Sequence, residues 1–148
     1  MIQREIKFRA KRKDGLGWAY GYFMKTPITT EFNCDGQFLD SGGIGRYCII
    51  QNGCAHEIIT GTLGQFTGYK DMENVEIYEG DILDPSKREV LFVEYESPFG
   101  MGTGWCTKAH ANTDWPEMNE CAFSMTSRQI DSSKVVGNIH DNPELLDI

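Results

Sequence analysis

The stretch LGQFTGYKDMENVEIYEGDIL, residues 63–83, decides the fold class of this chain. Gly64 and Gly68 bracket a short extended piece, and residues 70–74 form a polar turn. Residues 75–78 then alternate between apolar and polar side chains, the period of two expected of a half-buried strand. We expect Gly80 to lie in a tight turn before the next strand, with Ile77 and Ile82 buried in one core. The stretch therefore predicts short strands joined by tight turns.

Toward the N-terminus the same period appears twice. Ile6, Phe8 and Ala10 alternate with Lys7, Arg9 and Lys11, and Asp14-Gly15 supplies turn chemistry. The aromatic residues of the next run alternate as well, and end in a methionine: Trp18, Tyr20, Tyr22 and Met24. These two runs predict a β-hairpin. Its apolar and aromatic side chains should face the core, and its charges should face water.

Toward the C-terminus the chain continues as short strands. They are expected at residues 90–93, 105–107, 121–125 and 134–139. Asn142 followed by Pro143 favours one helical turn that ends at Leu146. Residues 28–60 and 108–120 give weaker patterns, and we interpret them as a variable insert and a surface excursion.

Composition limits the classes of protein that remain. A chain of 148 residues fits one domain or a compact domain with an appendage, divided here into a hairpin and variable region, 1–62, and a second part, 63–148. Its net charge of −8 opposes attraction of the whole molecule to nucleic acid or to an anionic membrane. The start of the chain does not resemble a secretory signal and no apolar stretch is long enough to span a membrane, so a cytoplasmic location is expected.

Three stretches in this order resemble the YopX family of phage and prophage proteins. They are REIKFRA (residues 4–10), GQFTGYKD with EIYEGDIL (residues 64–83) and VVGNIHDNPELL (residues 135–146). The resemblance covers nearly the whole chain. It implies an SH3-like barrel in the C-terminal part and no assigned biochemical activity. The predicted fold is therefore mainly β, a small SH3-like barrel with an N-terminal β-hairpin and a variable insert.

One departure from the family pattern concerns the turn before EIYEGD. Relatives often carry Asn-Gly there, and this chain has Asn74-Val75. Valine strongly disfavours the positive φ that a type I′ turn requires. The turn is therefore expected to be longer or of another type.

Candidate chemistry in the sequence is weak. Cys48, Cys54 and His56 have a C-x5-C-x-H spacing, unlike the close pairs of zinc sites, so the cysteines are expected to be free thiols. The Gly-rich residues 100–104 lack the ending of a phosphate loop. An acidic cluster does not fit an EF-hand loop and is interpreted as a solvated face: Asp71, Glu73, Glu76, Glu79, Asp81 and Asp84. The sequence predicts no catalytic residue, no cofactor and no metal site.

The sequence leaves two hypotheses about the function of this chain. The favoured hypothesis is a non-enzymatic, phage- or prophage-encoded protein-interaction module, whose partner is a second copy of the chain or an unidentified host or phage protein. The alternative is a weak nucleic-acid-binding accessory protein. Its contacts would come from the basic N-terminal strand and the turn that follows: Lys7, Arg9, Lys11, Arg12 and Lys13. The first hypothesis is favoured because the chain is acidic and the hairpin aromatics are expected to be buried.

Overall fold

The structure, a computed structural model, is mainly β, as predicted. It describes residues 5–26, 31–32, 38–39, 46–84, 91–96, 104–109, 122–124, 130 and 132–146. The chain forms two compact units, residues 1–65 (unit 1) and residues 66–148 (unit 2). Each unit has its own hydrophobic core.

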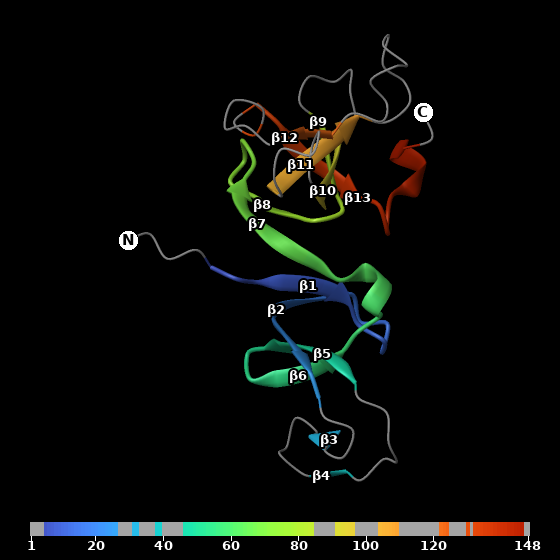
Figure 1. Ribbon diagram of the computed structural model, residues 1–148. Helices are drawn as coiled ribbons and strands as arrows, with labels where there is room; N and C mark the ends of the chain where they lie inside the picture. Colours follow the sequence, from blue (N-terminus) through green and yellow to red (C-terminus); the bar gives the residue numbers. More distant parts are fainter. Residues whose placement is uncertain are drawn as a thin grey trace. The chain divides into compact units, whose positions relative to one another are not determined.

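Unit 1 begins with the predicted hairpin. Strand β1 (Phe8–Lys11) pairs antiparallel with β2 (Trp18–Lys25), as Figure 1 shows. Strand β5 (Tyr47–Gln51) lies on the other side of β2 and pairs with β6 (Cys54–Glu57). The β5–β6 turn is Asn52-Gly53, and both residues have positive φ, 51° and 80°. This is the conformation of a type I′ hairpin turn, for which Asn-Gly is the preferred dipeptide.

The chain then returns to β1. Ile58 forms a bridge with Arg12, and after the 3-10 helix η1 (Thr60–Thr62) the strand β7 (Gly64–Lys70) begins beside β1. Strands β3 (Glu31–Phe32) and β4 (Phe38–Leu39) form a separate pair within the variable region. The core of unit 1 consists of small and β-branched side chains: Ala10, Ala19, Ile49 and Ile58.

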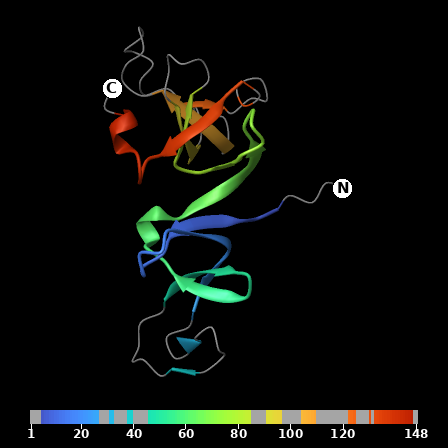
Figure 2. The same cartoon turned by 180° about the vertical axis from the view of Figure 1, so that it is seen from behind.

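Unit 2 is built from the end of β7 and six further strands. Strand β7 pairs with β8 (Glu76–Tyr78). The other five form one antiparallel sheet in the order β12-β11-β10-β9-β13: β9 (Asp81–Asp84), β10 (Leu91–Glu96), β11 (Gly104–Ala109), β12 (Ala122–Ser124) and β13 (Lys134–Asn138). The predicted helical turn is the 3-10 helix η4 (Pro143–Leu146), which follows β13 in Figure 2.

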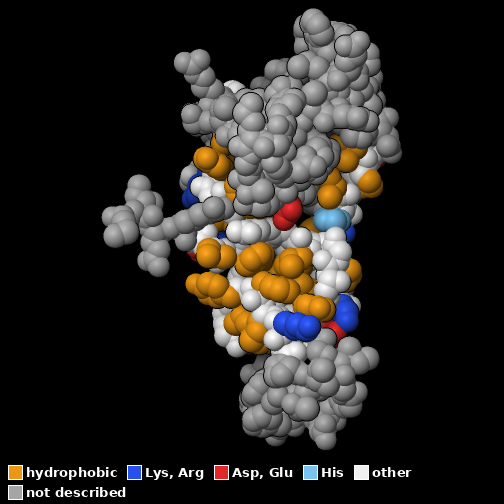
Figure 3. All heavy atoms as spheres, in the orientation of Figure 1, with side chains coloured by type: hydrophobic (Ala, Val, Ile, Leu, Met, Phe, Trp, Pro, Cys, Tyr) orange, Lys and Arg blue, Asp and Glu red, His pale blue; other side chains and the backbone are white. Residues whose placement is uncertain are grey.

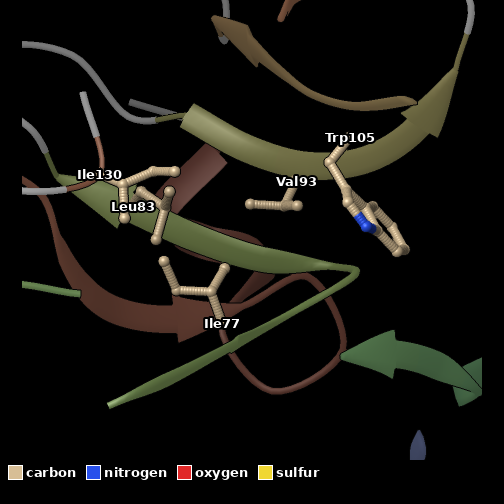
Figure 4. Close-up of a cluster of buried hydrophobic side chains, with 5 residues drawn as sticks. All are labelled: Ile77, Leu83, Val93, Trp105 and Ile130. Atoms are coloured by element: carbon tan, nitrogen blue, oxygen red, sulfur yellow. The ribbon is translucent and has the colours of Figure 1, made fainter. Parts of the chain in front are cut away.

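The core of unit 2 is a cluster contributed by several strands. Figure 4 shows its five side chains: Ile77, Leu83, Val93, Trp105 and Ile130. Gly80 lies in the tight β8–β9 turn with a φ of +81°, as predicted. Ile77 and Ile82 are both fully buried, but Leu83, not Ile82, belongs to the cluster of Ile77. Neighbouring residues of a strand point to opposite faces, so the expectation of one shared core was wrong.

The turn before β8 is longer than a two-residue hairpin turn, as predicted. The amide of Asp71 donates to the carbonyl of Val75 at 2.8 Å, which encloses a three-residue loop. Asn74 takes the positive φ, 67°, that this loop requires. Val75 therefore does not take the positive φ that its branched side chain disfavours.

The SH3-like detail of the prediction is not confirmed. Among the strands described, the five-stranded sheet of unit 2 has β12 and β13 as its two edges, with no pairing between them. Mainly-β architecture is thus established, and closure of a barrel over residues 63–148 is not. Within the described parts of the chain, no helix is long and apolar enough to cross a membrane.

Candidate functional site

Of the aromatic side chains of β2, Phe23 packs against the core, whereas Trp18, Tyr20 and Tyr22 lie on the opposite face, so the prediction that this alternating set is buried was wrong. Ala19 is 0% exposed, whereas Tyr20 and Met24 are each 38% exposed and Tyr22 is 68% exposed. The physical reason is the close approach of β2 to β5. A Cβ atom on Gly21 would lie 2.0 Å from the carbonyl oxygen of Ile50, so only glycine fits at this position of the inner face, which also carries Ala19 and Phe23.

The opposite face of the hairpin combines aromatic and basic residues. Arg9 lies opposite Tyr20, and Lys11 lies opposite Trp18, in the β1–β2 pairing. Because side chains alternate along a strand, the same face carries the following residues, which we name the β1–β2 outer face: Arg9, Lys11, Trp18, Tyr20, Tyr22 and Met24. Figure 3 shows hydrophobic side chains exposed on unit 1 beside Lys and Arg side chains.

The Trp18 ring contacts both basic side chains of this face. The guanidinium carbon of Arg9 lies 4.9 Å from the centroid of the Trp18 ring, and the Lys11 ammonium lies 5.8 Å from it. Both distances fit cation–π attraction. Arg9 is 7% exposed and therefore nearly buried, whereas Lys11 is half-buried. Arg9 thus contributes positive charge beneath the surface, and Lys11 contributes it at the surface.

The other three predicted basic residues lie outside β1, and two of them form ion pairs. Lys7 is half-buried just before β1 begins. Arg12 forms an ion pair with Asp14 in the hairpin turn, and Lys13 forms one with Glu57 of β6. The hydrogen bond from Arg12 holds the pKa of Asp14 below its ordinary value of 3.8. Within β1, the row of bases on this face therefore consists of Arg9 and Lys11.

Asp71 is the clearest functional group that the sequence reading missed. It was assigned to a solvated face, yet it is only 7% exposed. Its Oδ1 accepts hydrogen bonds from the amides of Glu73 (2.8 Å) and Val75 (2.9 Å), and its Oδ2 accepts one from Val135 (2.9 Å). A single carboxylate thus fixes the β7–β8 loop and joins it to β13. The signal in the sequence was an aspartate at the first position of a turn.

Asp81 is the second buried member of the acidic cluster, at 1% exposed. Its Oδ2 accepts a hydrogen bond from the Tyr78 amide at 2.7 Å, across the turn at Gly80. The Gly80 amide donates to Val93, and the Gly80 carbonyl accepts from the Ile139 amide at 2.9 Å. The motifs GYKD, EIYEGDIL and VVGNIHDN therefore meet in unit 2 through backbone hydrogen bonds. Asp71 and Asp81 correct the interpretation of the cluster as fully solvated.

The cysteine and histidine candidates do not converge. In the β5–β6 pairing Cys48 lies opposite Glu57, whereas Cys54 and His56 lie opposite Gln51 and Ile49. Alternation places Cys48 on one face of the sheet and the other two on the opposite face. Burial raises the pKa of the Cys48 thiol. Among the described residues, no group of three or more metal-ligating side chains lies close together.

The described strands and motif positions define a mainly-β protein of two small units. A family model described as YopX protein matches residues 7–147, so this chain belongs to the YopX family. No curated protein matches the chain. Among solved structures, the crystal structure of protein EF1440 from Enterococcus faecalis is 23% identical, with a TM-score of 0.47. That alignment covers 97% of this chain and 99% of the other.

Proposed function

We propose that this chain is a non-enzymatic, phage- or prophage-encoded interaction module that acts in the cytoplasm through its β1–β2 outer face. One observation carries the proposal. Tyr20, Tyr22 and Met24 are exposed on one sheet face while Ala19 and Ile49 fill the core on the other. Tyrosine and methionine are enriched in binding interfaces, and a run of exposed apolar side chains on a small domain is typical of a contact surface.

The placement of the polar motif residues supports a non-enzymatic role. Asp71 and Asp81 are engaged by backbone amides, and Gly80 supplies a turn conformation. These residues therefore stabilise unit 2 directly. Their hydrogen bonds account for polar residues that would otherwise be candidates for acid–base chemistry.

The residues beside the tyrosines bear on the class of partner that we propose. The sequence favoured a protein partner because the aromatics were expected inside. Their position beside Arg9 and Lys11 now supports the nucleic-acid alternative. Self-association stays a prediction, for which light scattering at micromolar concentration should give a mass above that of the monomer.

A photo-crosslinking experiment tests the interaction face. Tyr22 is replaced by p-benzoylphenylalanine in cells that express the tagged protein, and Tyr69, which is 41% exposed in unit 2, receives the same replacement as control. We expect a discrete crosslinked species from position 22 and none from position 69. Equal crosslinking from both positions, or none from either, would contradict the proposed face.

A further inference from the structure

The β1–β2 outer face contains two parallel rows with different chemistry. Tyr20 and Tyr22 are two residues apart on β2, so their backbone positions are separated by about 6.8 Å. Arg9 and Lys11 lie on the neighbouring strand at about 4.8 Å, and Lys7 precedes them. Exposed aromatic rings stack with bases of any sequence, while lysines follow the phosphate backbone. The face thus offers both kinds of contact in adjacent rows.

The charge of the chain is divided between its two units. Unit 1 carries eight Lys and Arg against six Asp and Glu, a net charge of +2. Unit 2 carries six against sixteen, a net charge of −10. The negative total that argued against nucleic acid therefore belongs to unit 2. The unit that presents the aromatic row has the sign that complements phosphate.

We propose that the β1–β2 outer face binds single-stranded nucleic acid. Bases stack on Tyr20 and Tyr22, Lys7 and Lys11 hold phosphates, and Arg9 supports the Trp18 ring from beneath. A duplex does not fit this chemistry because its bases are already stacked and paired, which leaves the two rings without partners. The inference identifies the partner of the proposed interaction face and rests on that proposed function.

Fluorescence anisotropy with the full chain tests the proposal. The probes are a labelled twelve-nucleotide oligothymidylate and a duplex that contains the same strand, titrated between 25 and 200 mM salt. We expect micromolar binding of the single strand at the low end and at least tenfold weaker binding of the duplex. Stacking of about 1–3 kcal/mol per base predicts that Tyr22→Ala weakens binding by about fivefold or more. Tyr22→Trp should preserve it, and the matched control Tyr69→Ala should leave it unchanged.

The salt dependence of binding distinguishes the contribution of the lysines from that of the tyrosines. Each neutralised phosphate of a single strand contributes about −0.7 to the slope of log K against log salt. Lys7→Gln and Lys11→Gln should each make the slope less negative by about that amount, whereas Tyr22→Ala should lower affinity at an unchanged slope. An affinity and a salt slope that stay unchanged in both the tyrosine and the lysine variants would overturn the proposal. If the oligonucleotide does not bind but position 22 still crosslinks to a protein, the nucleic-acid inference fails and the proposed interaction face stands.

Discussion

Removal of the Asp71 carboxylate should destabilise unit 2 more than a nearby change of equal charge. The carboxylate accepts three backbone hydrogen bonds and is 7% exposed. The amides of Glu73 and Val75 belong to an exposed loop and can be rehydrated, so each lost bond costs about 1 kcal/mol. The Val135 amide lies in β13, and leaving it without an acceptor costs about 1–3 kcal/mol more. Asp71→Ala should therefore lower the free energy of unfolding by about 3–5 kcal/mol.

Urea unfolding followed by tryptophan fluorescence measures this loss, since Trp105 lies in the core of unit 2. With a slope of about 1–2 kcal/mol per molar urea, a loss of about 3–5 kcal/mol should lower the midpoint by roughly 1.5 M or more. Asp71→Asn retains one acceptor oxygen but turns a donor toward Val135, so its loss should be intermediate. Glu73→Gln is the matched control, because it removes a nearby charge that pairs with the exposed ammonium of Lys134, at 2.9 Å. A midpoint for Asp71→Ala equal to that of Glu73→Gln would refute the reasoning.

Two further predictions concern unit 1. Gly21→Ala should destabilise it by about 1–3 kcal/mol because the added Cβ would lie 2.0 Å from the Ile50 carbonyl oxygen. Gly61→Ala is the control, because a Cβ atom there meets nothing within 4 Å, and it should leave the thermal midpoint unchanged. Equal midpoints for Gly21→Ala and Gly61→Ala would contradict the close approach of Gly21 to Ile50. Alkylation should be slower at Cys48 than at half-buried Cys54, measured by mass spectrometry at pH 8. Burial raises the pKa of the Cys48 thiol above 9.0, so less of the reactive thiolate is present at pH 8. The stabilising contribution of the neutral thiol is complete below pH 9.0 and is lost as the pH rises through the pKa of the folded state. Equal alkylation rates at Cys48 and Cys54 would contradict the burial of Cys48.

Strong alternation made much of the fold predictable. The hairpin β1–β2, the turn at Gly80 and the helical turn from Pro143 follow from local pattern and turn chemistry. Such signals depend on neighbouring residues alone. They do not specify which face of a strand becomes the core when both faces carry apolar side chains.

The orientation of β2 shows why that choice failed. In WAYGYFMK both alternating sets contain apolar residues, and the regular alternation of Trp18, Tyr20 and Tyr22 predicted that this set fills the core. At Gly21 the pairing with β5 leaves no space for a side chain, and the inner face is formed by Ala19, Gly21 and Phe23. A change of one residue in register turns every side chain of a strand over, so this single long-range contact reversed the assignment. No local pattern contains the distance between two strands that are distant in the sequence.

The motifs of unit 2 and the aromatic row of the β1–β2 outer face occupy different parts of this chain. GYKD, EIYEGDIL and VVGNIHDN are joined in unit 2 by Asp71 and by the Gly80 turn, where they determine backbone geometry. The aromatic row that we expect to contact a partner lies on β2, between the motifs REIKFRA and GQFTGYKD. Substitutions at Tyr20 or Tyr22 change an exposed surface and leave the hydrogen bonds of unit 2 intact. The hydrogen bonds that fix unit 2 therefore place no constraint on the tyrosines, so the partner of this chain must be inferred from the outer face of the hairpin and not from the motifs of unit 2.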